Sequence, residues 1–393
     1  MSAFREAAAI TALNLRNVPS RLGMSLVIVV GIAGVVGVLI SLLAMAGGLA
    51  STVANTGRPD RAIVLHSGSV SELASALSRE DVLAILDAPG MRRGPDGKPV
   101  ASAEAVTVIE MTKAGDGTPA NVTLRGVGAG NAALRPEARI VAGRMLRPAL
   151  RELVVGKAAQ SQFRGLAPGS RIKLRGADWT VVGVFETGDA QESEIWGDAE
   201  TLLSAYGRSI FQDVTVQLEG PDAFDRFKAA LTANPRLAVD VQREPDYYEA
   251  QTRIFADTMF YIGYLVGAIM TVGAIFAALN TMYSAVSART VEIATLRAIG
   301  FGAGAVVSSV FAEALLLSLA GAVVSAALAW LVFNGHVVSI SGAGHAQLIF
   351  PIAVTPGLVA RGIVWGCVIG LLGGLAPAIR AARLPVATVL RAL

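Results

Sequence analysis

Cysteine and histidine are scarce in this chain of 393 residues, which contains one cysteine and three histidines. The single cysteine, Cys367, lies inside a long apolar run, so the rest of the chain has neither a disulfide framework nor a thiolate metal cluster. His336 and His345 lie nine residues apart in a segment rich in glycine and serine, a spacing that matches no compact zinc motif. We therefore expect no metal site, and a soluble part that folds by packing alone.

Motifs for common catalytic chemistry are also missing. No Gly-x-Ser-x-Gly elbow occurs, and no Gly-x-x-x-x-Gly-Lys-Ser/Thr loop is present to bind phosphates. The string Gly156-Lys157-Ala158 lacks both the upstream glycine and the hydroxyl that would contact magnesium. The sequence therefore argues against a membrane enzyme, and any nucleotide hydrolysis linked to this chain must come from a separate chain.

Charged residues make up only 16% of the chain, whereas hydrophobic residues make up 53%. The apolar residues are concentrated in four long runs, each of which can supply the roughly 20 residues that a helix needs to cross a hydrocarbon core of about 30 Å. These runs lie at residues 22–54, between Asp257 and Arg289, between Glu313 and about Trp330, and from Arg361 to Arg380. They predict an α-helical membrane protein with four transmembrane helices, one before and three after a large insert.

The first run has an alternative interpretation as a cleaved signal peptide. Arg16 and Arg21 precede it, and Ala44-Met45-Ala46 resembles a small-residue cleavage site. The apolar core of a signal peptide is only about 7 to 15 residues long, however, and this run is about twice that length. Its length favours a retained membrane anchor.

Basic residues flank the four runs unevenly. They occur before the first run, between the second and third, and after the fourth, whereas residues 334–356 contain neither lysine nor arginine. The positive-inside rule then places both termini and the hairpin after the second run in the cytoplasm and the insert outside. The net charge of +3 is thus a topology signal, and without a clustered basic face we expect no nucleic-acid partner. The flanking residues include Arg5, Arg16, Arg21, Arg289, Arg297, Arg380, Arg383 and Arg391.

The insert of about 200 residues has the composition of a water-soluble α+β domain. Interspersed charges and β-branched alternation predict strands at 61–66, 100–111, 121–127, 152–155, 171–174, 179–185 and 213–218. Helices are predicted at 78–86, with Ser78 as N-cap, and at 222–231. The complete predicted order is a cytoplasmic segment 1–21, helix 22–50, extracytoplasmic domain 51–253, helix 254–284, cytoplasmic coupling helix 285–303, helix 304–333, short loop 334–355, helix 356–379 and cytoplasmic tail 380–393.

Polar residues within and between the apolar runs are the candidate functional residues. Glu313 lies just inside the third run, where a carboxylate is costly unless it is paired, and it could serve a proton relay or helix packing. Asn280 is expected to form a hydrogen bond between helices. The hairpin at 292–300 has the pattern of a short interfacial helix, with Ile293, Leu296 and Ile299 on one face and Arg289, Glu292 and Arg297 interrupting it.

The string Glu-Ile-Ala-Thr-Leu-Arg-Ala-Ile-Gly at 292–300 resembles the signature of permease subunits of ABC systems in the FtsX/MacB/LolC superfamily, the type VII or mechanotransmission class. Residues 313–317 and 377–386 resemble the family's third helix and C-terminal end. Segments at 143–144, 152–156, 169–172 and 181–184 resemble its MacB-like periplasmic core domain. The resemblance covers nearly the whole chain.

The resemblance implies a permease that is not catalytic by itself. ATP and magnesium would be bound by a separate cytoplasmic ABC ATPase, which would contact Arg289, Glu292, Ile293, Leu296, Arg297 and Gly300. A second permease copy or paralogue, membrane lipid and, in some systems, a periplasmic adaptor protein are the other implied partners. Two functions remain open: one half of an ATP-driven complex that exports or extracts a lipid, lipoprotein, peptide or drug, or a signalling scaffold that transports nothing and activates a periplasmic hydrolase.

The topology can be tested by cysteine labelling. We expect Asp116→Cys to react with a membrane-impermeant thiol reagent in intact spheroplasts and Arg391→Cys not to react, because the positive-inside rule places these residues on opposite sides. The parent chain, whose only cysteine lies in the fourth run, is the control for background labelling. Labelling of Arg391→Cys in intact spheroplasts would overturn the orientation.

Overall fold

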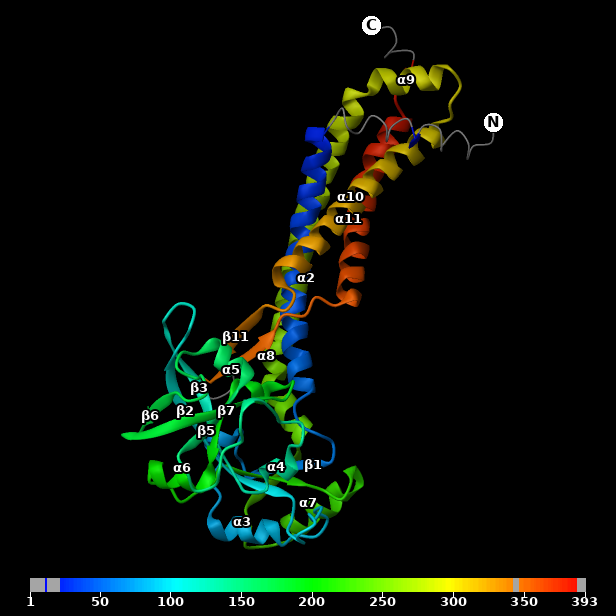
Figure 1. The fold of residues 1–393 in the computed structure, drawn as a ribbon. Coiled ribbons are helices and arrows are strands. Elements are labelled where there is room, and N and C mark those ends of the chain that lie inside the picture. The colour runs from blue at the N-terminus through cyan, green and yellow to red at the C-terminus, as the bar shows by residue number, and fades with distance from the viewer. Residues whose placement is uncertain (1–10, 13–21, 342–345, 387–393) are drawn as a thin grey trace. The chain divides into compact units, whose positions relative to one another are not determined.

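The computed structural model describes residues 11–12, 22–341 and 346–386. Within these residues the chain forms two compact units, each visible in Figure 1. The helical unit contains the residues up to Gly47, Asp257–His336 and the residues from Ile352 onward, and the sheet unit contains Gly48–Ala256 and Val337–Pro351. Arg5, Arg16, Arg21, His345 and Arg391, all discussed above, lie outside the described residues.

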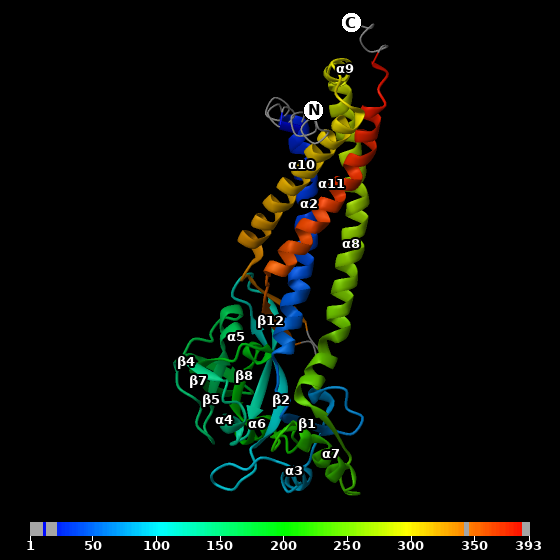
Figure 2. The same ribbon diagram turned by 90° about the vertical axis from the view of Figure 1, so that its right-hand side faces the viewer.

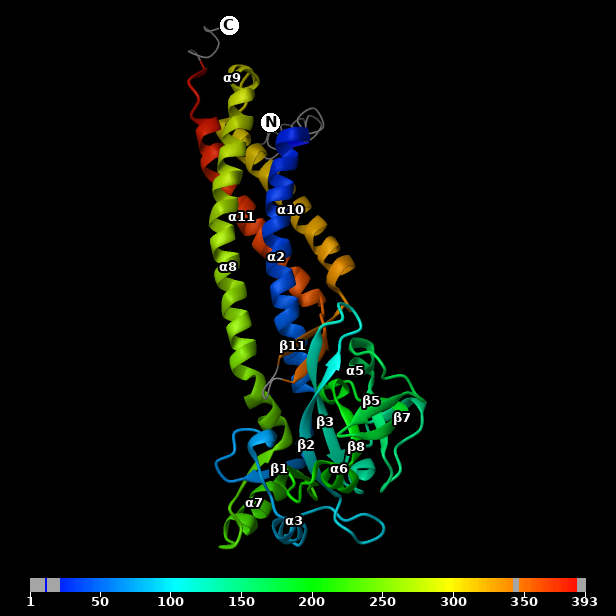
Figure 3. The ribbon, with the colours of Figure 1, turned by 90° about the vertical axis from the view of Figure 1, so that its left-hand side faces the viewer.

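Four helices are long and apolar enough to cross a membrane, which confirms the four predicted runs. They are α2 (Leu22–Ala54), α8 (Glu244–Ala288), α10 (Ala303–Phe333) and α11 (Pro356–Ala382). In the helical unit their apolar stretches run side by side (Figures 2 and 3). Thr355 caps α11 by accepting a hydrogen bond from the Leu358 backbone N–H, and Pro356 occupies the first turn, where its missing N–H costs nothing. The helix α8 continues without interruption for 45 residues.

A stripe of glycines on α11 allows the helices of this unit to pack closely. A methyl group added at Gly366 would lie 2.7 Å from the Ala322 side chain of α10, and one added at Gly362 would lie 2.6 Å from Ile40 of α2. Gly373 similarly faces Ala278 of α8. Apolar side chains give helices little preference for one another over lipid, so such small-residue contacts and their dispersion energy hold membrane helices together.

The sheet unit is built on one mixed sheet of ten strands within the described residues, in the order β10-β1-β9-β2-β3-β8-β5-β7-β4, with β6 paired to β7. The pairs β3/β8 and β5/β7 are parallel and the others are antiparallel. The strands are β1 (Arg61–His66), β2 (Ala101–Thr112), β3 (Pro119–Val127), β4 (Arg139–Gly143), β5 (Glu152–Gly156), β6 (Arg171–Leu174), β7 (Ala177–Glu186), β8 (Ile195–Asp198), β9 (Asp213–Gln217) and β10 (Val239–Arg243).

The long strand β2 joins the two halves of this sheet. Its first residues, from Ala101 to Glu104, pair with β9, and the following residues, from Ala105, pair with β3. Short helices pack on the strands: α6 on β2, β3 and β8, α5 on β5 and β7, and α7 on β10. The short α-helices of the sheet unit are α3 (Arg79–Leu86), α4 (Asn131–Leu134), α5 (Lys157–Gln162), α6 (Ala199–Tyr206) and α7 (Phe224–Thr232).

All seven predicted strands and both predicted helices are confirmed, with ends that differ by at most two residues. The N-cap prediction is also confirmed, because Ser78 and Asp81 form a reciprocal capping box at the start of α3. The sequence analysis missed β4, β8 and β10. Strand β8 is only four residues long and fully buried, so it lacks the alternation that reveals a half-buried strand.

The predicted short loop at 334–355 contains two strands that the sequence analysis did not predict. Residues Val337–Ser341 (β11) and Gln347–Pro351 (β12) form an antiparallel two-stranded sheet that belongs to the sheet unit. The Ser193 hydroxyl donates to the Ile349 carbonyl at 3.2 Å and accepts from its backbone N–H at 2.9 Å. Ile349 also joins the hydrophobic core of the sheet unit. The segment between α10 and α11 is therefore a structural part of the soluble domain.

The glycine stripe generates a stability prediction. An added methyl at Gly370 would lie 2.1 Å from the Ser318 hydroxyl oxygen and 2.4 Å from its Cβ atom, so we expect Gly370→Ala to destabilise the helical unit by roughly 1 to 3 kcal/mol. Gly31→Ala on α2 is the matched control, because no atom lies within 4 Å of its added methyl. Thermal unfolding of both variants in one detergent measures the difference. Equal unfolding temperatures would show that the stripe is not a packing interface.

Candidate functional site

The hairpin between α8 and α10 contains a short separate helix, α9 (Thr290–Ala298), where the sequence analysis predicted one, and its interfacial position stays a prediction. Figure 1 shows α9 beyond the end of α8 and at an angle to it. Arg289 separates the two helices with non-helical backbone angles. Gly300 follows α9 with φ +108°, a conformation that residues with a side chain rarely adopt, and α10 begins at Ala303.

The exposed face of α9 differs from the predicted apolar face. Ile293 is buried, whereas Ile299 is 68% exposed, so these two residues do not share one environment. The exposed residues of α9 are Val291, Glu292, Thr295 and Ala298, and the exposed Ile299, which follows the helix as its C-cap, continues the four-residue spacing of Val291 and Thr295. This mixed strip of apolar and acidic residues is the surface that the hairpin offers to another molecule.

Arg289 points inward instead of toward a partner. Its Nη2 donates to Glu313 Oε2 of α10 at 2.6 Å, and both residues are almost completely buried. Each side chain compensates the charge of the other, which offsets the free-energy cost of placing a carboxylate inside an apolar helix. This ion pair is consistent with the helix-packing role considered for Glu313. Arg289, which was predicted to contact the ATPase, links the junction between α8 and α9 to α10 through this ion pair.

Arg297 forms a second fastening, at the other end of α9. Its Nη1 donates to the backbone carbonyls of Ala382 and Leu384, both at 2.9 Å. Because the last carbonyls of a helix have no partner within it, this arginine completes the C-terminal end of α11 and ties it to α9. Its guanidinium is thus engaged within this chain, a role different from the predicted ATPase contact.

Asn280 does not lie between helices of this chain, contrary to the prediction. Its side chain is exposed on α8, and its backbone carbonyl accepts a hydrogen bond from the Ser284 hydroxyl. The inward face of α8 is formed near this point by Ala278 and Met282, which are buried. A hydrogen bond between α8 and α11 is formed earlier in α8 than Asn280, where Trp365 Nε1 of α11 donates to the Thr271 hydroxyl of α8 at 2.7 Å.

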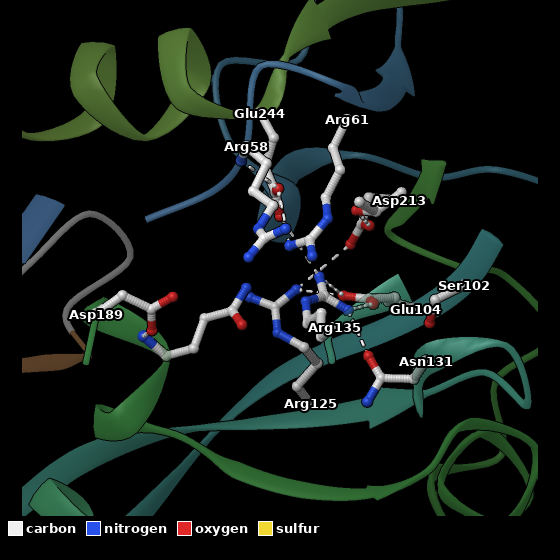
Figure 4. A network of polar contacts seen from close by, with 12 residues as sticks. Arg58, Arg61, Ser102, Glu104, Arg125, Asn131, Arg135, Asp189, Asp213 and Glu244 are labelled. Atoms are coloured by element: carbon white, nitrogen blue, oxygen red, sulfur yellow. Dashed lines mark hydrogen bonds and ion pairs between the residues drawn. The ribbon is translucent and has the colours of Figure 1, made fainter. Parts of the chain in front are cut away.

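The sheet unit contains a buried ionic network that the sequence analysis did not find (Figure 4). Arg125 of β3 lies at its centre with 1% exposure and donates two hydrogen bonds to Glu194, two to Glu72 and one to Glu104. Arg135 donates to Glu104 and Asn131. Charged residues were visible within the predicted strands at 100–111 and 121–127, and such a residue in an apolar strand is the signal that could have indicated this network.

The network also holds the first turn of α8. Glu244, the first residue of this helix, is completely buried and accepts a hydrogen bond from the Arg58 backbone N–H at 3.2 Å. Its carboxylate lies 3.5 Å from Arg61 and 3.8 Å from Arg135. One turn later, the Tyr247 hydroxyl accepts a hydrogen bond from the Glu72 backbone N–H at 2.9 Å. The start of α8 is therefore fixed to the sheet by charged and polar contacts.

Carboxylates outnumber guanidiniums in this network. Arg61, Arg125 and Arg135 are in contact with six carboxylates, those of Glu72, Glu104, Glu137, Glu194, Asp213 and Glu244. Burial raises the pKa of Asp213 well above its usual value, and neighbouring Glu104 and Glu72 add to the shift. Burial also raises the pKa of Glu72 and of Glu244, whereas Arg135 and Arg125 outweigh burial at Glu104 and lower its pKa.

The pKa of Asp189, a buried carboxyl near this network, allows an experimental test of the electrostatics. Burial raises its pKa to about 6, against hydrogen bonds from the Thr187 hydroxyl and the Gln191 backbone N–H and with a further increase from the Glu244 carboxylate. The folded state therefore binds the Asp189 proton more tightly than the unfolded state, and this contribution to stability is lost as the pH rises from about 4 through about 6. We expect Asp189→Asn, whose carbonyl oxygen can still accept both bonds, to be about 2 to 3 kcal/mol more stable than the parent at pH 7.

Thermal unfolding of the full chain in detergent between pH 4 and pH 7 measures this difference. The advantage of Asp189→Asn should shrink strongly as the pH falls to 4, because the parent carboxyl is then protonated in the folded state and partly protonated in the unfolded state. Asp225→Asn, on the exposed side of α7, is the control and should follow the parent throughout. A stability difference that does not change with pH would contradict the assignment.

Comparisons with known proteins agree with this architecture. Residues 25–234 match the MacB-like periplasmic core domain, and residues 264–386 match the FtsX-like permease C-terminal domain. A curated relative, the uncharacterized ABC transporter permease YknZ of Bacillus subtilis (strain 168), is 26% identical over 251 residues, which span 59% of each chain.

Two solved structures also resemble part of the chain. The extracellular domain of the ABC-type transporter YknZ from Gram-positive bacteria covers 46% of this chain and 99% of that domain, with 19% identity and a TM-score of 0.35. The periplasmic region of MacB from Actinobacillus actinomycetemcomitans covers 50% of this chain and 94% of that region, with 11% identity and a TM-score of 0.37. The first family match alone includes more than half of the 393 residues, and this protein therefore belongs to the family of ABC transporter permeases with a MacB-like periplasmic core domain and an FtsX-like permease domain.

Proposed function

We propose that this chain is the permease subunit of an ATP-driven complex that exports or extracts a hydrophobic molecule, such as a lipid, lipoprotein, peptide or drug. A separate cytoplasmic ABC ATPase would bind ATP and magnesium, and its closure would be passed through the permease to the extracytoplasmic domain. A second permease copy or paralogue would complete the assembly, and an adaptor protein could join it on the outer side. The α9 hairpin, firmly held yet partly exposed, is the observation that carries this proposal.

The α9 hairpin is suited to receive a mechanical input. Arg289 fastens its beginning to α10 and Arg297 fastens its end to α11, so a force applied to α9 would be transferred directly to these helices. The strip of Val291, Glu292, Thr295 and Ile299 remains exposed for contact. The strip presents Val291 and Ile299 as its apolar residues, with the polar Thr295 between them, and a helix with such a partly apolar face can bind in a groove of a partner protein.

The helix α8 is suited to carry the motion further. It has 45 residues, about 65 Å at the rise of an α-helix, and its only proline is at the second position, where it does not break the helix. Its first residue, Glu244, is held by the buried ionic network, and its last residue is followed directly by Arg289. A displacement at the hairpin would therefore reach the soluble domain through continuous helix.

The orientation in this proposal follows the basic residues. Arg289, Arg297, Arg380 and Arg383 belong to the α9 hairpin or to the adjacent end of α11, which Arg297 links to α9. Under the positive-inside rule this end of the helical unit faces the cytoplasm, where an ATPase would be available.

Charge reversal at the exposed strip tests the coupling role. A charge-assisted hydrogen bond that Glu292 accepts from the ATPase could contribute roughly 1.5 to 3 kcal/mol, and its loss would weaken binding about tenfold or more at each site. We expect the purified permease alone to hydrolyse no ATP, and Glu292→Lys to abolish the stimulation of its ATPase in lipid. Glu110→Lys, an exposed position on β2, is the control and should leave stimulation unchanged.

A second substitution tests the shape of the hairpin instead of its charge. Gly300→Val should abolish stimulated ATPase activity, because valine is strained at φ +108°. Gly304→Val is its matched control: neither glycine has an atom within 4 Å of an added methyl, but Gly304 has ordinary backbone angles. Normal ATPase binding and turnover in both Glu292→Lys and Gly300→Val would show that the hairpin is only a loop.

A further inference from the structure

A cavity of about 130 Å³ lies in the sheet unit beside the buried ionic network. Its apolar walls include Leu73, Tyr247, Tyr248 and Leu348, which come from the short 3₁₀ helix Glu72–Ala74, the beginning of α8 and strand β12. The two tyrosine rings meet edge to face with their centroids 5.2 Å apart. The three elements are distant in the sequence, so the cavity exists only when the domain is folded.

The polar side chains that line the cavity have hydrogen-bond acceptors left for a ligand, but the arginine among them has no donor left. Arg125, Glu72 and Glu194 all face the cavity. Arg125 already makes five hydrogen bonds to carboxylates, which equals the number of its N–H groups. It therefore has no donor left for an anionic ligand, even though a buried arginine usually suggests one.

The two carboxylates retain capacity to accept hydrogen bonds. Each oxygen of Glu72 accepts one bond from Arg125, although a carboxylate oxygen can accept about two. Glu194 Oε2 accepts from Arg125 and Trp196, whereas Glu194 Oε1 accepts a single bond. The cavity thus offers unused acceptor positions on two carboxylates, next to a network in which four guanidiniums contact six carboxylates.

We propose that this cavity is a binding site for a small organic ammonium ion that carries one aromatic or branched apolar group. The ammonium would donate to Glu72 and Glu194, and the apolar group would lie against Leu73 and Leu348. The faces of Tyr247 and Tyr248 would add cation–π attraction. This cavity of about 130 Å³ is slightly smaller than a cavity of about 150 Å³ that holds benzene, so part of the apolar group would extend past the rim at Leu73, which is 38% exposed. The site goes beyond the proposed function, since its occupancy requires neither an ATPase nor transport.

A set of isosteric probes tests the charge preference on the full chain in lipid nanodiscs. The probes are 2-phenylethylammonium, neutral 2-phenylethanol and anionic phenylacetate, measured by ligand-observed NMR titration with empty nanodiscs as background. We expect saturable binding of the ammonium ion at least tenfold tighter than that of the alcohol, and no saturable binding of phenylacetate. Equal binding of the three probes, or no saturable binding of the ammonium ion, would overturn the proposal.

Substitutions then locate the site. Leu73→Trp should fill the cavity and weaken binding of 2-phenylethylammonium at least tenfold, because Leu73 lines it and is 38% exposed, which leaves room for the larger ring at its rim. Leu83→Trp is the matched control, since Leu83 is 65% exposed on α3 and does not line the cavity. Leu73→Lys, which brings a tethered ammonium to the same place, should also block the probe.

Unfolding temperatures close to the parent value will show that the three variants are folded. Undiminished probe binding in both Leu73 variants would place the ammonium ion elsewhere and refute the site. The probe comparison on the parent chain decides the charge preference independently of every variant, and ATPase stimulation in the Leu73 variants reports separately on the proposed function.

Discussion

The guanidinium of Arg125 is the element on which the soluble domain depends. It contacts carboxylates from the short 3₁₀ helix Glu72–Ala74, from β2, from the residue before β8 and from β9. Buried charges are expensive to remove from water, and only the complete set of partners offsets that cost. Loss of one member of such a set typically destabilises a protein by about 3 to 5 kcal/mol, because the remaining charges stay buried without compensation. The network thus favours one arrangement of these strands over other apolar packings of similar energy.

The helical unit is held in one arrangement with far fewer buried charges. Its described buried ion pair, Arg289 with Glu313, lies near the end of the helices, and much of its remaining packing is between glycines and apolar side chains. The two arrangements follow from the surroundings. A sheet in water gains from covering its apolar face, so it can tolerate a polar centre in which most groups are paired, whereas helices in lipid gain mainly from close contact of their backbones.

The sequence predicted those features that depend on local periodicity. Four apolar runs were sufficient to identify the four long helices, and Ser78 followed three residues later by Asp81 identified the start of α3. Features that depend on distant partners were not predictable in the same way. Arg289 and Arg297 looked like surface residues of a hairpin, but their partners on α10 and near the end of α11 turn both of them inward. The position of Asn280 was predicted to face another helix, but its side chain is exposed. Helix periodicity alone does not say which face of α8 the neighbouring helices cover.

The inward positions of the two arginines change what a partner protein can recognise on the hairpin. If both had pointed outward, recognition would have been mainly electrostatic, and an acidic groove would have been the expected partner surface. The exposed residues are instead Val291, Thr295 and Ile299, with Glu292 as the acidic member of the strip. A complementary surface would therefore be an apolar groove with a single basic or N–H donor at its rim, because an apolar strip supplies most of the affinity in a helix-in-groove contact and one charged bond fixes its register. The arginines contribute indirectly: they tie α9 to α10 and α11, so in the proposed function work done on the strip would move the membrane helices.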